Sequence, residues 1–123
     1  MIARGHVAIV VSDVEASIRF YTDILGLKLG TRFAEDWVTL IAGNGLTIGL
    51  LPPSKHYPAP GTKGAMMIGL EIDEDIEIVV VRLAARGVPF TGKIVRDPRA
   101  GAFANFEDPD GNPFYLWQVA WKA

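Results

Sequence analysis

The chain has 123 residues, half of them hydrophobic and 21% charged, which is typical of a single globular domain. Its formal net charge of −2 and its scattered Lys and Arg residues leave no broad basic surface for phosphates, so nucleic acid is not an expected partner. The absence of cysteine excludes disulfides, thiolate metal sites and cysteine nucleophiles.

The first residues, 1–6, lack the long apolar core and the cleavage site of a signal peptide. No apolar run in the chain reaches about 18 residues, the length needed to cross a membrane as a helix. These two features predict a cytoplasmic protein that has no membrane partner. The lack of cysteine agrees with a reducing compartment.

The first part of the chain predicts a strand, a helix and three more strands. Gly5–Val11 is a short, valine-rich apolar run typical of a buried strand. The segment Ser12–Glu15 matches a capping box, so an amphipathic helix is expected to begin near Asp13 and to stop at Gly26. Ser12 is interpreted as a helix cap. Three further strands are predicted at 27–33, 37–42 and 46–51, the last two joined by the turn Gly43-Asn44-Gly45.

The segment 52–64 is rich in proline and glycine and is predicted to be a linker. After it the same order of elements returns. The pattern predicts a strand at 65–72, a helix at 75–86 that stops at Gly87, and a strand at 88–95. A final hairpin is expected to pair 103–107 with 114–119 across the turn-forming segment 108–112.

The recurrence can be tested by sliding the chain against itself. A shift of 61 residues places the first strand on the strand after the linker and aligns Gly26 with Gly87. A shift of 66 aligns the two closing hairpins and places Gly45 on Gly111. We interpret the difference of five residues as a longer loop around Asp97–Gly101. The chain is therefore expected to be one domain, 1–123, with module one at 1–51, a linker at 52–64 and module two at 65–123.

Three segments carry a family resemblance: the first strand with His6, the sequence Phe-Tyr-Thr-Asp-Ile-Leu-Gly-Leu at 20–27, and Phe-Glu-Asp-Pro-Asp-Gly-Asn-Pro at 106–113. Together they resemble the vicinal oxygen chelate superfamily, which includes glyoxalase I, extradiol dioxygenases and bleomycin-binding proteins. The resemblance implies an α+β fold of two βαβββ modules that form a curved open barrel with the helices outside. It also implies a small-molecule ligand inside and a homodimer.

Enzymes of that superfamily hold a divalent ion at four positions, which correspond here to His6, Gly49, Met67 and Tyr115. The repeat supports this assignment, because His6 aligns with Met67 at shift 61 and Gly49 with Tyr115 at shift 66. Only His6 is a good ligand: glycine has no side chain, a thioether is soft, and tyrosine must first lose a proton with a pKa near 10. A catalytic site needs about three protein ligands. The sequence therefore predicts no metal and no other cofactor.

Neighbouring Glu, Asp and His residues are possible substitutes for the missing ligands. Strand alternation directs Glu71 to the same face as Met67, but about 6 to 7 Å further along the strand. Glu107, Asp36 and His56 could approach only through loop or hairpin geometry. His6 by itself is also explained as a hydrogen-bonded pocket or core histidine.

The remaining side chains predict an apolar and aromatic cup for an organic ligand. The expected ligand-binding residues are His6, Trp37, Gly49, Met67, Glu71, Tyr115 and Trp117. Gly49 is expected to leave open space that its repeat partner Tyr115 fills, which would make the pocket asymmetric. The alternative is that the aromatic side chains simply fill the barrel.

Two functions stay open. The first is a binding protein that sequesters a small organic compound without a metal. The second is a lyase, isomerase or dioxygenase of the glyoxalase I type, with a degenerate metal site or with metal-free proton transfer by His6, Glu71 and Tyr115. Phosphate-binding loops, dinucleotide fingerprints and the Gly-x-Ser-x-Gly motif of hydrolases do not occur in the sequence.

Overall fold

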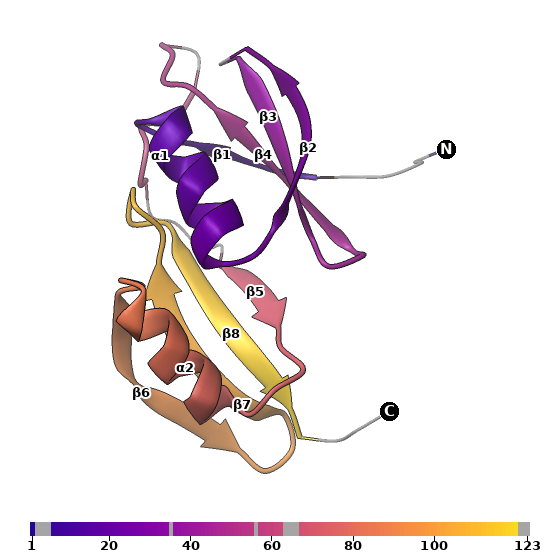
Figure 1. Cartoon of the computed structure of the whole chain (residues 1–123), viewed down its shortest axis with the longest axis vertical. Helices are drawn as coiled ribbons and strands as arrows, with labels where there is room; N and C mark the ends of the chain where they lie inside the picture. Colours follow the sequence, from indigo (N-terminus) through magenta and orange to yellow (C-terminus); the bar gives the residue numbers. More distant parts are fainter. Residues whose placement is uncertain (2–5, 35, 56, 63–66, 121–123) are drawn as a thin grey trace. The chain divides into compact units, whose positions relative to one another are not determined.

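The computed structural model describes residues 1, 6–34, 36–55, 57–62 and 67–120 (Figure 1). Its internal contacts divide the chain into two compact units, Met1–Thr62 and Lys63–Ala123. The boundary between the units falls inside the linker predicted at 52–64. Each unit contains one of the two predicted modules. The prediction that the two modules form a single domain stays a prediction.

The first unit is a four-stranded mixed sheet with one helical segment. Its elements are β1 (Val7–Val10), α1 (Val14–Arg19), η1 (Phe20–Ile24), β2 (Lys28–Phe33), β3 (Trp37–Ala42) and β4 (Leu46–Leu51). The strands lie in the order β1-β4-β3-β2, with β1 parallel to β4 and the other pairs antiparallel. The predicted βαβββ order of the first module is therefore confirmed.

The second unit repeats this topology. Its elements are β5 (Ile68–Glu71), α2 (Ile76–Ala85), β6 (Phe90–Asp97), β7 (Gly101–Glu107) and β8 (Pro113–Val119). The strand order is β5-β8-β7-β6, again with one parallel pair, β5 and β8. The strand predicted at 65–72 is shorter than expected, and residues 65 and 66 of that prediction lie outside the described residues. No helix in the described part of the chain is long and apolar enough to cross a membrane.

Both helices begin at an aspartate and are followed by a glycine. Asp13 accepts a hydrogen bond from the Ala16 backbone N–H, and Asp75 accepts one from the Glu77 N–H, so each caps its helix. The cap of the first helix is thus Asp13 and not Ser12. Gly26 and Gly87 have positive φ angles of 81° and 97°, a conformation that glycine adopts at little cost.

The first helix is not α-helical along its whole length. From Asp13 to Gly26 the chain is one residue longer than from Asp75 to Gly87, and in the first unit the helix continues as the π-helical turn η1 (Phe20–Ile24). A π-helical turn takes up an additional residue without ending the helix. The side chain of Tyr21 within this turn is completely buried.

Each helix packs on one face of its sheet. On the second sheet this face is marked by Gln118 of β8, whose side-chain oxygen accepts a hydrogen bond from the Ile76 N–H at the start of α2. Ala102 pairs with Gln118 and points to the same side, as do Ala104 and Phe106, all of which are buried. The core of each unit thus lies between one helix and one sheet face.

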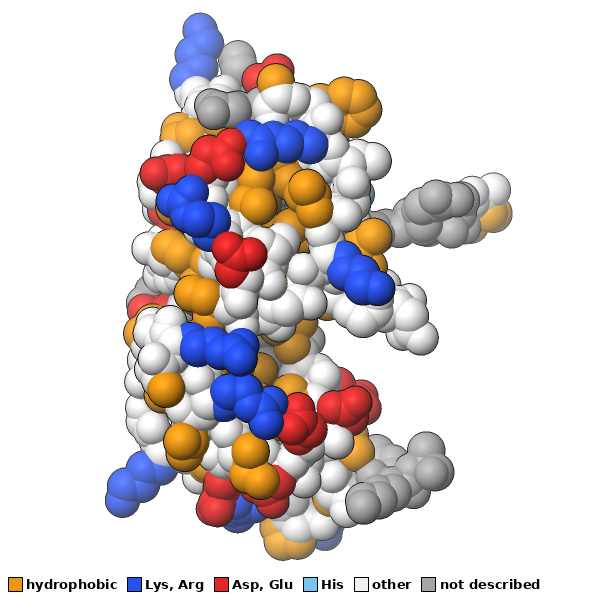
Figure 2. Space-filling view, in the orientation of Figure 1, with side chains coloured by type: hydrophobic (Ala, Val, Ile, Leu, Met, Phe, Trp, Pro, Cys, Tyr) orange, Lys and Arg blue, Asp and Glu red, His pale blue; other side chains and the backbone are white. Residues whose placement is uncertain are grey.

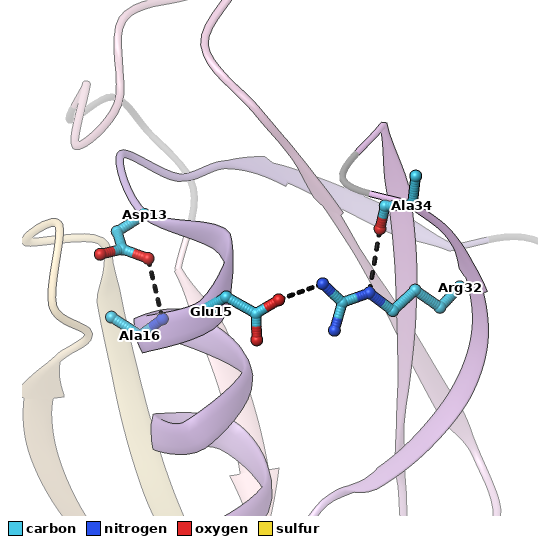
Figure 3. Close-up of polar contacts among 5 residues, drawn as sticks. All are labelled: Asp13, Glu15, Ala16, Arg32 and Ala34. Carbon is cyan, nitrogen blue, oxygen red and sulfur yellow. Dashed lines mark hydrogen bonds and ion pairs between the residues drawn. The ribbon is translucent and has the colours of Figure 1, made fainter.

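An ion pair connects the first turn of each helix to the edge strand of its sheet. Arg32 of β2 contacts Glu15 of α1 and also donates to the Ala34 carbonyl (Figure 3). Arg96 of β6 contacts Glu77 of α2 in the corresponding place. Figure 2 shows acidic side chains beside some of the basic ones within each unit. The repeat therefore extends to surface charges as well as to the core.

The β6–β7 hairpin has longer strands than its counterpart in the first unit, the β2–β3 hairpin. β2 and β3 have six residues each, whereas β6 has eight and β7 has seven. The turns 34–36 and 98–100 are equally long. The prediction of a longer loop around Asp97–Gly101 is therefore wrong, because β6 and β7 together have three residues more than β2 and β3 while the turn between them has none. This extension brings Gly101 opposite Val119 at the end of β8.

Two surface ion pairs predict a dependence of stability on pH. Hydrogen bonding by Arg32 lowers the pKa of Glu15, and hydrogen bonding by Arg82 lowers the pKa of Glu74. A carboxylate with a lowered pKa stabilises the fold above the pKa it has in the unfolded chain, and this contribution is lost as the pH falls through the folded value. We expect the free energy of unfolding in urea to fall less steeply between about pH 6 and about pH 3 in a Glu15→Gln/Glu74→Gln double variant.

The expected difference is small, because both pairs are exposed and salt screens them. Repeating the titration at high salt should bring the two curves together. Identical slopes at low salt would show that neither pair contributes to folding.

Candidate functional site

The predicted site residues lie on or next to the sheet faces that point away from the helices, which we call the distal faces. On the second sheet this face carries Gly69 and Glu71 of β5, Tyr115 and Trp117 of β8, and Phe103 of β7. Side chains directly opposite each other on neighbouring strands point to the same side, and here Gly69 pairs with Tyr115 and Glu71 with Trp117. Phe103 lies on β7, the other neighbour of β8, and also pairs with Trp117, so its side chain points to the same face.

In the first module, the ring of Trp37 lies directly over Gly49. A Cβ atom at Gly49 would come within 2.1 Å of the indole Cη2, so only glycine leaves room for the ring. The imidazole of His6 packs edge-on against the same indole, with 5.0 Å between the ring centroids. The space expected to be open at Gly49 is therefore filled by Trp37. His6 is exposed, which excludes the interpretation of this residue as a core histidine.

In the second module, the ring of Tyr115 lies over Gly69, as the ring of Trp37 lies over Gly49 in the first. A Cβ atom at Gly69 would lie 2.4 Å from Cζ and 2.5 Å from the hydroxyl oxygen of Tyr115. Both modules thus lay an aromatic ring across a neighbouring strand where a glycine omits its side chain. Such rings lie against the sheet, and Trp37 and Tyr115 are only partly buried.

Two further aromatic rings extend this surface. Phe103 and Trp117 lie parallel, with 1° between their planes and 6.3 Å between centroids, and the centroid of Phe103 is 5.9 Å from that of Tyr115. The Trp117 indole N–H donates a hydrogen bond of 2.9 Å to the Ala100 carbonyl. Because Ala100 immediately precedes Gly101, this bond ties the Trp117 ring to the turn of the β6–β7 hairpin.

Sequence reasoning missed Phe103 and the glycine under Tyr115. The signal for Phe103 was present, because a shift of 66 places Trp37 on Phe103. The role of Gly69 could not be read from alternation, which tells only the face of a residue. Asp36 is exposed in the turn before β3, and His56, a further possible ligand, lies outside the described residues.

Comparison with known proteins now identifies the family. The model of the Glyoxalase/Bleomycin resistance protein/Dioxygenase superfamily matches residues 3–116. The chain belongs to this superfamily. An uncharacterised protein of Escherichia coli K12, YaeR, is 31% identical over 121 residues, covering 92% of this chain and 93% of YaeR.

Solved structures of superfamily members have the same fold. A member from Sphaerobacter thermophilus matches with a TM-score of 0.80 and 31% identity, covering 95% of this chain and 98% of that one. TnmS3, an antibiotic binding protein from Streptomyces sp. CB03234, matches with a TM-score of 0.74 and 28% identity, covering 97% and 99%. A lactoylglutathione lyase from Agrobacterium tumefaciens, with a TM-score of 0.72 and 21% identity over 94% and 92%, shares the fold.

The four positions that superfamily enzymes use for a divalent ion do not fit a metal here. At Gly49 a ligand side chain could not be introduced without displacing Trp37, and Tyr115 has its ring over Gly69. Met67 is 51% exposed and offers only a soft thioether. No group of three or more His, Asp or Glu residues within the described ranges could hold a metal ion.

Neither module by itself brings together the three residues predicted for proton transfer. Glu71 and Tyr115 lie on neighbouring strands of the second module, where Tyr115 is opposite Gly69 and Glu71 is two residues further along. His6 belongs to the first module and contacts Trp37. What the second module assembles is a surface of three aromatic rings with a carboxylate at one end.

Proposed function

We propose that this superfamily member is a small-molecule-binding protein of the sequestration type, which holds a flat organic compound without a catalytic metal. The observation that carries the proposal is the aromatic surface of the second module, formed by Phe103, Tyr115 and Trp117. All three rings are partly buried and therefore keep area for a ligand. The description of TnmS3 as an antibiotic binding protein agrees with such a role in a relative.

The way these rings are held favours binding. Tyr115 rests on Gly69, and Trp117 is oriented by its hydrogen bond to Ala100 and by Phe103. Side chains that are already ordered lose little conformational entropy when a ligand arrives, so more of the contact energy contributes to affinity. A stacked pair of aromatic rings contributes about 0.5 to 1.5 kcal/mol beyond the area it buries.

The proposal predicts that Gly69→Ala weakens ligand binding. The added methyl group must displace the Tyr115 ring, so we expect the affinity for a flat neutral probe such as acridine to fall roughly tenfold, as for other aromatic residues central to binding surfaces. Isothermal titration calorimetry measures this change. Gly45→Ala is the matched control, because a Cβ atom at Gly45 meets nothing within 4 Å.

Circular dichroism and urea denaturation establish that both variants are folded. Unchanged affinity in Gly69→Ala would contradict the assignment of Tyr115 to the binding surface. If the parent chain binds none of a panel of flat organic compounds, the proposed function itself is wrong.

Elemental analysis tests the metal-free part of the proposal. We expect protein purified without added metal to contain zinc, manganese, nickel and iron well below one ion per chain, because the side chains at the four positions are poor ligands. A near-stoichiometric content of any of these metals would favour the alternative of a lyase, isomerase or dioxygenase.

A further inference from the structure

We infer that the aromatic surface of the second module selects organic cations, namely flat compounds that carry a positively charged nitrogen. The inference rests on the proposed function and adds the chemical class of its ligand. It is carried by the distribution of charge over the three strands that form the surface and by the position of Glu71 beside Trp117.

The three strands contain acidic residues and no basic ones. Together β5, β7 and β8 include Glu71 and Glu107 but no Lys, Arg or His. Both glutamates lie on the distal face: Glu71 is paired with Trp117, and Glu107 alternates in phase with Phe103 along β7. A sheet face with two carboxylates and three aromatic rings offers negative charge and π-electron density, and no partner for an anion.

Basic residues of the second sheet lie at its far edge. The strand order β5-β8-β7-β6 separates β6 from Glu71 by two strands. Of the two cations on β6, Arg96 contacts Glu77 at the start of α2, on the helix side, and Lys93 lies where the pairing of β6 and β7 is irregular. The Glu71 side chain is exposed, and its carboxylate makes no ion pair or hydrogen bond with any residue that the structure describes. Its charge is therefore available to a ligand.

The geometry places this charge next to an aromatic ring. Side chains directly opposite each other on neighbouring strands have Cβ atoms about 4.5 to 5.5 Å apart, so the Glu71 carboxylate can reach a cation that lies over the Trp117 ring. A cation within about 6 Å of an indole centroid is attracted by the ring itself. Phe103, parallel to Trp117, continues the surface for the flat part of the same ligand. The row Glu71, Trp117, Phe103 thus matches a molecule with a charged end and a planar body.

Three probes of nearly the same shape test the inference: N-methylacridinium, a permanent cation; acridine at a pH where it is neutral; and the anion acridine-9-carboxylate. By calorimetry at low salt we expect the cation to bind roughly tenfold tighter than acridine, and the anion to bind more weakly than either. Added salt should reduce the difference between cation and neutral probe. In Glu71→Gln the ratio of the two affinities should fall severalfold, to the part that the attraction of the aromatic rings for a cation supplies.

Glu77→Gln is the matched control, because it removes the same charge from α2, on the opposite side of the same sheet. It should keep the preference for the cation, which separates the local effect of Glu71 from the net negative charge of the chain. If acridine or its carboxylate binds and the cation has no advantage, or if Glu71→Gln keeps the whole advantage, the inference is wrong while the proposed function stands. If none of the three probes binds, both are contradicted.

Discussion

Gly101→Ala is expected to lower the free energy of unfolding by about 3 to 5 kcal/mol, the largest effect that we predict for a single methyl group in this protein. Gly101 has a φ angle of 120°, and a Cβ atom there would lie 2.0 Å from the Gln118 carbonyl oxygen and 2.8 Å from the Ala120 nitrogen. Both atoms belong to the backbone, so no side-chain rotation can relieve the contact. Urea denaturation measures the loss.

The same substitution should also change the candidate site. Gly101 follows Ala100, whose carbonyl orients the indole of Trp117. A shift of the β7 backbone at this point would release the Trp117 ring, and we expect a weaker near-ultraviolet circular dichroism signal and weaker binding of acridine.

Gly92→Ala is the control that distinguishes the cost of a positive φ angle from the cost of the steric clash at Gly101. Gly92 also has a positive φ angle, 71°, but a Cβ atom there would meet nothing within 4 Å. We expect it to cost about 1 to 2 kcal/mol, from the unfavourable backbone conformation alone. Equal losses in the two variants would show that β7 and β8 can separate at Gly101, against the close approach seen in the structure.

Asp108→Ala is expected to cost about 2 to 4 kcal/mol, because it removes a buried acceptor that serves several donors. Asp108 is 4% exposed and accepts hydrogen bonds from the backbone N–H groups of Asp110 and Asn112 and from the Asn112 side-chain amide. These bonds close the turn that aligns β7 with β8. Loss of the carboxylate leaves donors without an acceptor in a place that water reaches poorly.

Asp97→Ala provides the comparison for Asp108→Ala. Asp97 likewise accepts two backbone hydrogen bonds, from Arg99 and Ala100, in the turn at the other end of β7. Because Asp97 is exposed, water can replace the lost acceptor, and we expect a cost of only about 1 kcal/mol. The prediction fails if the buried and the exposed aspartate contribute equally.

The predictions that relied on local pattern agree with the structure. Both helix starts, both glycine stops and the order of the strands follow from capping residues, from positive-φ requirements and from the alternation of apolar residues. The shift of 66 that aligns the closing hairpins also places Trp37 on Phe103, but Phe103 was not predicted as a site residue. The error at Asp97–Gly101 has a different origin. The repeat gives the number of additional residues in the second module but does not tell whether they belong to a loop or to a strand.

The aromatic surface illustrates the limit of such reasoning. Alternation correctly indicated that Glu71, Tyr115 and Trp117 share one side of the second sheet. It could not indicate that Trp37 covers Gly49 or that Tyr115 covers Gly69, since a ring that lies across a neighbouring strand depends on the pairing register and on the direction of its side chain.

The sequence by itself determined that the protein consists of two βαβββ modules and that three of the four positions used by superfamily enzymes are poor metal ligands, because both conclusions depend on residue types and spacing. Only the tertiary structure decided what occupies the place of those ligands. Trp37 lies over Gly49, and the extended β6–β7 hairpin orients Trp117 through Ala100. The reason is that these contacts join residues far apart in the chain, and their geometry is set by strand pairing rather than by any local period.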